Sequence, residues 1–165
     1  GVTPPQTLRA VQLPLALAWA LGGIVTANIF SSAGPVYYGR LNAAPDLFAG
    51  HMDLIRGLSA SAKLEALVLQ DSLWAAYAAT PSFSSISAFP SMHVAIATLV
   101  FLACRHLGKW LKYLSAAYLA LIFLGSIFLG WHYAIDGYAG AGLALAAWWL
   151  GGVIAKKYGT EQARA

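Results

Sequence analysis

Four long apolar runs alternate with polar segments along the chain. No Lys, Arg, Asp or Glu lies between Arg9 and Arg40, or between Asp71 and Arg105. Because about 20 apolar residues are needed for a helix to cross the hydrocarbon core of a membrane, the pattern predicts an all-α, polytopic transmembrane helix bundle. Its four spans, of which the second is short, cover approximately residues 11–30, 90–106, 111–131 and 137–155.

A long polar segment, residues 31–89, separates the first two spans. Within it, residues 52–77 read MDLIRGLSASAKLEALVLQDSLWAAY, with apolar residues at the three- and four-residue spacing of a helix. This spacing predicts an amphipathic helix that lies at the membrane interface. No repeat or low-complexity linker interrupts the chain, so we expect a single membrane domain over residues 1–165.

Charge is sparse and unevenly placed. The chain is 59% hydrophobic and 10% charged, with a formal net charge of +4. A basic balance in a soluble protein would suggest nucleic acid, but here the basic residues cluster at span ends, so we expect no nucleic-acid partner. The positive-inside rule makes their face cytoplasmic, and it predicts a protein of a bacterial inner or plasma membrane with residues 31–89 facing the periplasm or exterior. The basic residues of the inner face are Arg9, Arg105, Lys109, Lys112, Lys156, Lys157 and Arg164.

Two polar motifs fall on the predicted outer face. Residues 89–93 read FPSMH at the start of the second span, and residues 130–140 read GWHYAIDGYAG between the third and fourth spans. His132 and Asp136 are four residues apart, so on a helix they share a face and the carboxylate can hold the imidazole. Ionisable groups at membrane depth are costly and usually functional. The sequence therefore predicts that these two side chains meet Ser91 and His93 in one site.

The two motifs together resemble the type 2 phosphatidic acid phosphatase superfamily. In that family a P-S-x-H segment opens one helix and an H-x-x-x-D segment follows, and here His93 and His132 are 39 residues apart. The resemblance covers roughly residues 25–155. It implies a chain that carries the last four helices of a six-helix core, without the two N-terminal helices.

The resemblance also implies a role for each site residue. His132 is the expected nucleophile, which forms a phosphohistidine, and Asp136 orients it. His93 is the expected general acid, while Ser91 and nearby backbone N–H groups hold phosphate oxygens. The family design implies no metal and no cofactor. The implied partners are a lipid phosphate and a water or alcohol acceptor within the membrane.

This chain departs from the common phosphatase pattern in two places. Gly125 and Ser126 stand where that pattern has serine and arginine. The family's first motif, a lysine and an Arg-Pro pair, is absent, and Arg40 is the only basic candidate for substrate contact near it. Both features are similar to the branch of inositol phosphorylceramide synthase and related lipid phosphotransferases. The acceptor stays open, since water would make the protein a phosphatase and a hydroxyl of inositol or a lipid would make it a transferase.

Other interpretations of the same residues remain. His93, His132 and Asp136 are residue types that also bind zinc or iron, so a metal- or haem-binding membrane protein is one alternative. A non-catalytic helical scaffold or transporter is another. Ser91 also fits a helix cap, and Arg40 also fits an anchor at the membrane interface.

Overall fold

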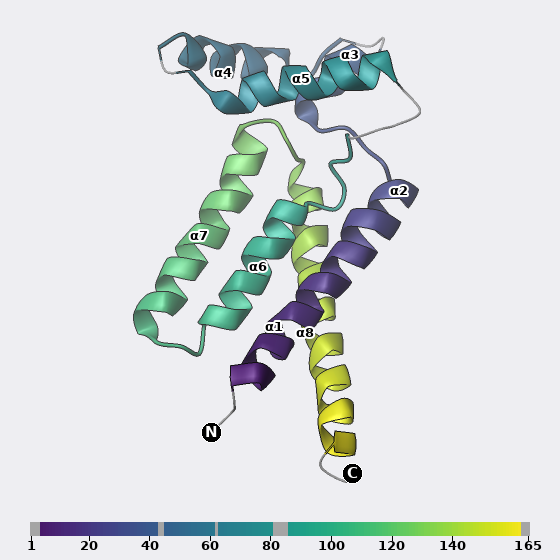
Figure 1. Cartoon of the computed structure of the whole chain (residues 1–165). Helices are drawn as coiled ribbons and strands as arrows, with labels where there is room; N and C mark the ends of the chain where they lie inside the picture. Colours follow the sequence, from purple (N-terminus) through teal and green to yellow (C-terminus); the bar gives the residue numbers. More distant parts are fainter. Residues whose placement is uncertain (1–3, 43–44, 62, 81–85, 163–165) are drawn as a thin grey trace.

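The computed structural model describes residues 4–42, 45–61, 63–80 and 86–162, and all secondary structure within these ranges is helical (Figure 1). The membrane part begins with a continuous rod in which a π-helical stretch, η1, lies between two α-helices. The elements are α1 (Pro4–Ala18), η1 (Trp19–Thr26), α2 (Ala27–Ile29), the 3-10 turn η2 (Pro35–Tyr37), α3 (Tyr38–Leu41), α4 (Ala49–Ser61), α5 (Glu65–Ala79), α6 (Met92–Cys104), α7 (Lys109–Phe128) and α8 (Ala134–Gln162).

Three of the four predicted spans are long and apolar enough to cross a membrane. They are Val11–Ile29, Lys109–Phe128 and Ala134–Lys157. The second predicted span is the 13-residue helix α6, which at 1.5 Å per residue is about 20 Å long and shorter than a hydrocarbon core of about 30 Å. Pro90 and Ser91, which the prediction placed inside this span, precede the helix. Within the described residues, the bundle therefore has three helices of spanning length and one shorter apolar helix.

Small residues form the core of the bundle. α6 packs against both α7 and α8, and α1 packs along α8 (Figure 1). The short side chains allow close approach of helix backbones, which is how membrane helices commonly associate. The buried members of this core are Ala18, Ala95, Leu99, Leu102, Ala144 and Ala147.

Helices α4 and α5 lie across one end of the bundle (Figure 1). We call these two helices, together with η2 and α3, the cap. The prediction of one amphipathic helix over residues 52–77 is wrong, because α4 ends at Ser61 and α5 begins at Glu65. The reversal lets both helices bury apolar side chains in one small core, which a single straight helix would leave uncovered. That core contains Val36, Tyr37, Met52 and Ile55, with Leu64 and Leu67 packed against it.

The cap is fastened to the end of α7. Three consecutive backbone carbonyls at that end, all lacking a following helical turn, accept hydrogen bonds from cap residues. The loop that leads from α7 to α8 is therefore positioned by the cap. The pairs are His51 Nε2 to Phe128 O at 2.7 Å, Gln70 Nε2 to Leu129 O at 2.8 Å, and Val36 N to Gly130 O at 3.0 Å.

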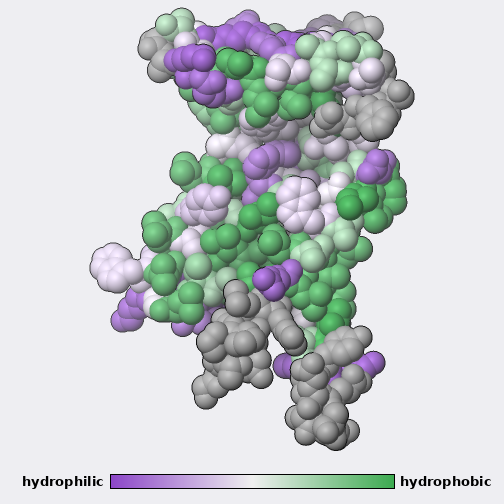
Figure 2. Space-filling view, in the orientation of Figure 1, coloured by the Kyte–Doolittle hydropathy of each residue, from purple (hydrophilic) through white to green (hydrophobic). Residues whose placement is uncertain are grey.

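The surface of the bundle is apolar. Figure 2 shows hydrophobic side chains around the bundle and hydrophilic ones gathered on the cap. On α7, Leu114, Leu121 and Leu124 are 68%, 69% and 64% exposed. Exposed leucines along a helix of spanning length are suited to lipid rather than water. The chain is an integral membrane protein.

Candidate active site

The loop between α7 and α8 carries His132. The backbone N–H groups of Trp131 and His132 both donate to the Ser126 carbonyl, at 3.0 and 3.3 Å, which holds the loop against the end of α7. The sequence placed His132 and Asp136 on one helix. In the structure His132 lies two residues before the start of α8 at Ala134, so the loop rather than helical periodicity sets the direction of its ring.

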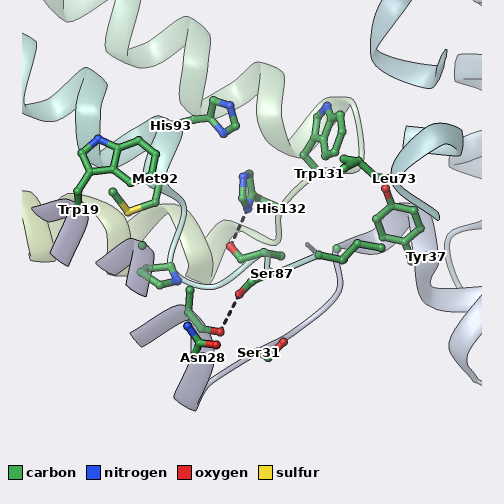
Figure 3. Close-up of a pocket in the computed structure, with 16 residues that line it drawn as sticks. Trp19, Asn28, Ser31, Tyr37, Leu73, Ser87, Met92, His93, Trp131 and His132 are labelled. Carbon is green, nitrogen blue, oxygen red and sulfur yellow. Dashed lines mark hydrogen bonds between the residues drawn. The ribbon is translucent and has the colours of Figure 1, made fainter. Parts of the chain in front are cut away.

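The His132 ring is buried and has a defined tautomer. Its Nδ1 lies 2.8 Å from the Ala88 carbonyl oxygen (Figure 3). Because a carbonyl only accepts, Nδ1 carries the hydrogen and Nε2 keeps its lone pair. Burial lowers the pKa of His132 to about 4; the hydrogen bond to Ala88 opposes this shift and the neighbouring His93 adds to it. At neutral pH the ring is therefore uncharged, and its Nε2 lone pair is chemically able to act as a nucleophile.

Asp136 lies beside this ring but has another hydrogen-bond donor. Its Oδ2 accepts from the Tyr133 backbone N–H at 2.8 Å, which closes the first turn of α8 in the manner of a capping box. The same oxygen is 3.8 Å from His132 Nδ1, beyond hydrogen-bond distance. The Ala88 carbonyl, which no sequence motif marks, holds the imidazole in place of the expected carboxylate. Asp136 therefore lies next to the ring without a hydrogen bond to it.

His93 faces His132 from the other side. It is the second residue of α6, and its ring centroid is 5.9 Å from that of His132. Figure 3 shows the two rings next to each other, with the His132 edge that bonds to Ala88 turned away from His93. His93 is exposed whereas His132 is 6% exposed. The pair thus combines the ring of His132, which is shielded from solvent, with the ring of His93, which can exchange protons with solvent.

Ser91 is the N-cap of α6 and is fully buried. Its hydroxyl accepts from the Val94 N–H at 3.4 Å, and its own N–H donates to the Asp136 carbonyl at 2.9 Å. At Gly140 on α8, an added Cβ would lie under 3.0 Å from the Ser91 carbonyl oxygen, so the two helices touch at this point. Ser91 therefore ties α6 to α8 and does not line the cavity beside the histidines.

Arg40 lies in the cap, at the end of α3. Its guanidinium pairs with Asp71 at 2.6 Å and stacks 5.3 Å above the Trp74 ring. It does not line the cavity at His132. The structure thus brings His93, His132, Asp136 and Ser91 together but keeps Arg40 apart.

A cavity of about 530 Å³ opens beside the two histidines. Its wall is formed by four parts of the chain: the rod of α1, η1 and α2, the cap, the segment before α6, and the α7–α8 loop. The wall includes polar groups that the sequence analysis did not single out. Ser87 is fixed there by donating to the Ala27 carbonyl at 3.1 Å. Among the described residues of the wall, none is Lys or Arg. The residues that the sequence missed include Trp19, Asn28, Ser31, Ser87 and Met92.

The geometry gives the metal-binding alternative little support. Among the described residues, no group of three or more His, Cys, Asp and Glu side chains is arranged to hold a metal ion. His132 Nδ1 and Asp136 Oδ2 are also already engaged by backbone groups.

Fold and site together define a helical membrane protein with a buried, neutral histidine opposite a second histidine at one end of the bundle. A family model described as the PAP2 superfamily matches residues 2–150. The chain belongs to this superfamily, which confirms the resemblance seen in the two motifs. Its members are generally phosphatases, so the chain is an enzyme of phosphatase-type phosphoryl transfer. No curated protein and no solved structure matches the chain.

Proposed function

We propose that this protein transfers the phosphoryl group of a membrane lipid through a phosphohistidine at His132. The observation that carries the proposal is the ring geometry: Nδ1–H is held by Ala88 at 2.8 Å, and the His93 ring is 5.9 Å away. Fixing one nitrogen as a donor presents the other as a nucleophile. The substrate is then attacked in the cavity that both histidines line.

The reaction has two half-reactions. In the first, the Nε2 lone pair forms a bond to phosphorus, the bond from phosphorus to the leaving oxygen breaks, and His93 protonates that oxygen. In the second, His93 removes a proton from the acceptor hydroxyl, whose oxygen binds phosphorus while the N–P bond breaks. Asp136, 3.8 Å from Nδ1, stabilises the positive charge that the ring carries as a phosphohistidine.

The charge of the cavity favours a phosphodiester substrate. Its described wall contains no Lys or Arg, so the available positive groups are His93, when protonated, and the N-terminal end of α6. These suit the single negative charge of a diester better than the two charges of a monoester. This supports the lipid phosphotransferase branch, in which a headgroup moves from one lipid to an alcohol acceptor.

The distribution of basic residues supports an outward-facing site. Two groups of basic residues lie at the end of the bundle away from the cap (Figure 1). The turn between α6 and α7 carries Arg105, Lys109 and Lys112, and the far part of α8 carries Lys156 and Lys157. The side chains of Arg9 and Arg164 lie outside the described residues. By the positive-inside rule, the cap and both histidines face the periplasm or exterior.

The direct test follows labelled phosphate in liposomes that contain the protein and EDTA. Phosphatidic acid and phosphatidylinositol, each labelled at phosphorus, are supplied with and without a lipid alcohol. We expect label to move to the alcohol. If water is the acceptor, label should instead appear as free phosphate from phosphatidic acid or as inositol phosphate from phosphatidylinositol. His132→Ala should lower turnover by about 10³-fold or more, as expected for loss of a nucleophile.

His106→Ala is the matched control, because His106 is exposed near the opposite end of α6 and its replacement should leave turnover unchanged. Label bound to the protein should be stable in base, be lost in acid, and map to His132. Equal turnover of the His132→Ala variant and the wild type would overturn the proposal. Dependence of turnover on added zinc or iron would instead favour the metal-binding alternative.

A further inference from the structure

A second cavity adjoins His132, and His93 is not part of its wall. It also measures about 530 Å³ and lies between the outer end of α7, helix α4 and the start of α8. Its wall is mainly apolar and includes Phe48, Leu124, Ile127 and Phe128. His132 is shared by both cavities, so its ring lies between a cavity whose wall mixes polar and apolar groups and one whose wall is mainly apolar.

The apolar cavity is framed by ordered aromatic contacts. The Phe48 ring meets the Tyr133 ring edge-on at 5.7 Å, and the His51 ring meets Phe128 in the same way at 5.7 Å. His51 also donates from Nε2 to the Phe128 carbonyl. The cap side of the cavity is therefore fixed by the same contacts that hold the α7–α8 loop.

The other side of this cavity opens towards lipid. Leu124 and Phe128 belong to a helix of membrane-spanning length and are 64% and 47% exposed. Exposed apolar side chains of such a helix face the hydrocarbon of the bilayer. A hydrocarbon chain can therefore pass from the bilayer along the outer end of α7 and reach His132 over a mainly apolar surface.

We propose that this second cavity binds an acyl chain of the lipid whose phosphate reacts at His132. The inference rests on the proposed function for the identity of the reacting lipid. The first cavity, whose wall includes Asn28, Ser31, Ser87 and both histidines, then receives the headgroup and the acceptor, and the apolar cavity selects substrates by chain length. Burial of methylene groups supplies the affinity.

The test compares two chain lengths in a variant that fills the cavity. Dioleoyl and dihexanoyl forms of phosphatidylinositol and of phosphatidic acid are assayed with Leu124→Trp. We expect the ratio of long-chain to short-chain kcat/KM to fall by about tenfold, because the indole occupies space otherwise filled by several methylene groups. Leu114→Trp is the control, since Leu114 is 68% exposed on the same helix but does not line the cavity, and its ratio should equal that of the wild type.

A second readout needs no turnover. A phosphatidylinositol with a photoreactive diazirine on its acyl chain should crosslink to residues 124–128 and Phe48, and Leu124→Trp should reduce that crosslinking. An unchanged ratio, or crosslinks spread evenly over α7, would overturn the inference. Absence of turnover in the wild type would count against the proposed function alone, because the crosslinking pattern still decides whether the cavity holds a lipid chain.

Discussion

At the scale of the residue, the orientation and tautomer of the His132 ring depend on a backbone carbonyl. Ala88 precedes the Phe89–Pro90–Ser91 segment and accepts from Nδ1 at 2.8 Å, which selects the tautomer. Burial removes the ring from water and disfavours its charged form. The sequence motif identifies the residue, whereas the burial and the Ala88 contact determine which nitrogen can attack and over what pH range.

The pH dependence of kcat/KM should reflect this environment. Attack needs the unprotonated ring, and the pKa of His132 is lowered to about 4. Activity should therefore persist as the pH falls through about 6.5, the ordinary value for histidine, and should be lost only as the pH approaches about 4. The measurement is a pH profile of kcat/KM in liposomes with initial-rate assays. An acid limb near pH 6.5 would show that the ring is not shielded.

At the scale of the element, the site depends on how closely α6 approaches α8. The start of α6 meets α8 where Ser91 lies against Gly140, and the Ser91 N–H donates to the Asp136 carbonyl across the same contact. This contact sets the position of His93, the second residue of α6, relative to His132 before α8. Helix packing therefore controls the distance between the two histidines.

Gly140→Ala tests this contact. The new methyl group would collide with the Ser91 carbonyl oxygen, and we expect a loss of about 1–3 kcal/mol in the free energy of unfolding, as for other overpacked sites, with a matching fall in turnover. Gly142→Ala is the control, because an added Cβ there meets no atom within 4 Å. Thermal unfolding in detergent and turnover in liposomes measure the two effects. If the Gly140→Ala and Gly142→Ala variants had the same thermal stability and the same turnover, the close contact would not have the role described.

At the scale of the whole molecule, the cap and the basic end give the protein a direction in the membrane. The cap carries hydrophilic side chains and is fastened to α7 through the Phe128, Leu129 and Gly130 carbonyls. The opposite end carries the basic residues of the α6–α7 turn and of α8. The site lies between bundle and cap, where the proposed lipid substrate would present its headgroup.

Cysteine labelling in intact cells measures this direction. Cys104, the single native cysteine, is replaced by serine, and one cysteine is introduced as either Ser72→Cys or Lys109→Cys, at exposed positions on the cap and on the basic end. A membrane-impermeant maleimide should label the cap variant in intact cells, and the other variant only after permeabilisation. If only the Lys109→Cys variant were labelled in intact cells, the protein would have the opposite orientation in the membrane.

The sequence by itself determined the helical membrane class, three of the four spans that it predicted and the superfamily, because apolar runs of spanning length and the spacing of two motifs are local properties of the chain. It did not determine that the amphipathic region folds back at Ser61, because that reversal depends on two helices sharing one core. The sequence singled out Ser91 but did not show that this residue is buried where α6 meets α8. The Ala88 carbonyl and the second cavity were decided by tertiary structure alone: every residue has a carbonyl, and a cavity exists only between elements that have already packed.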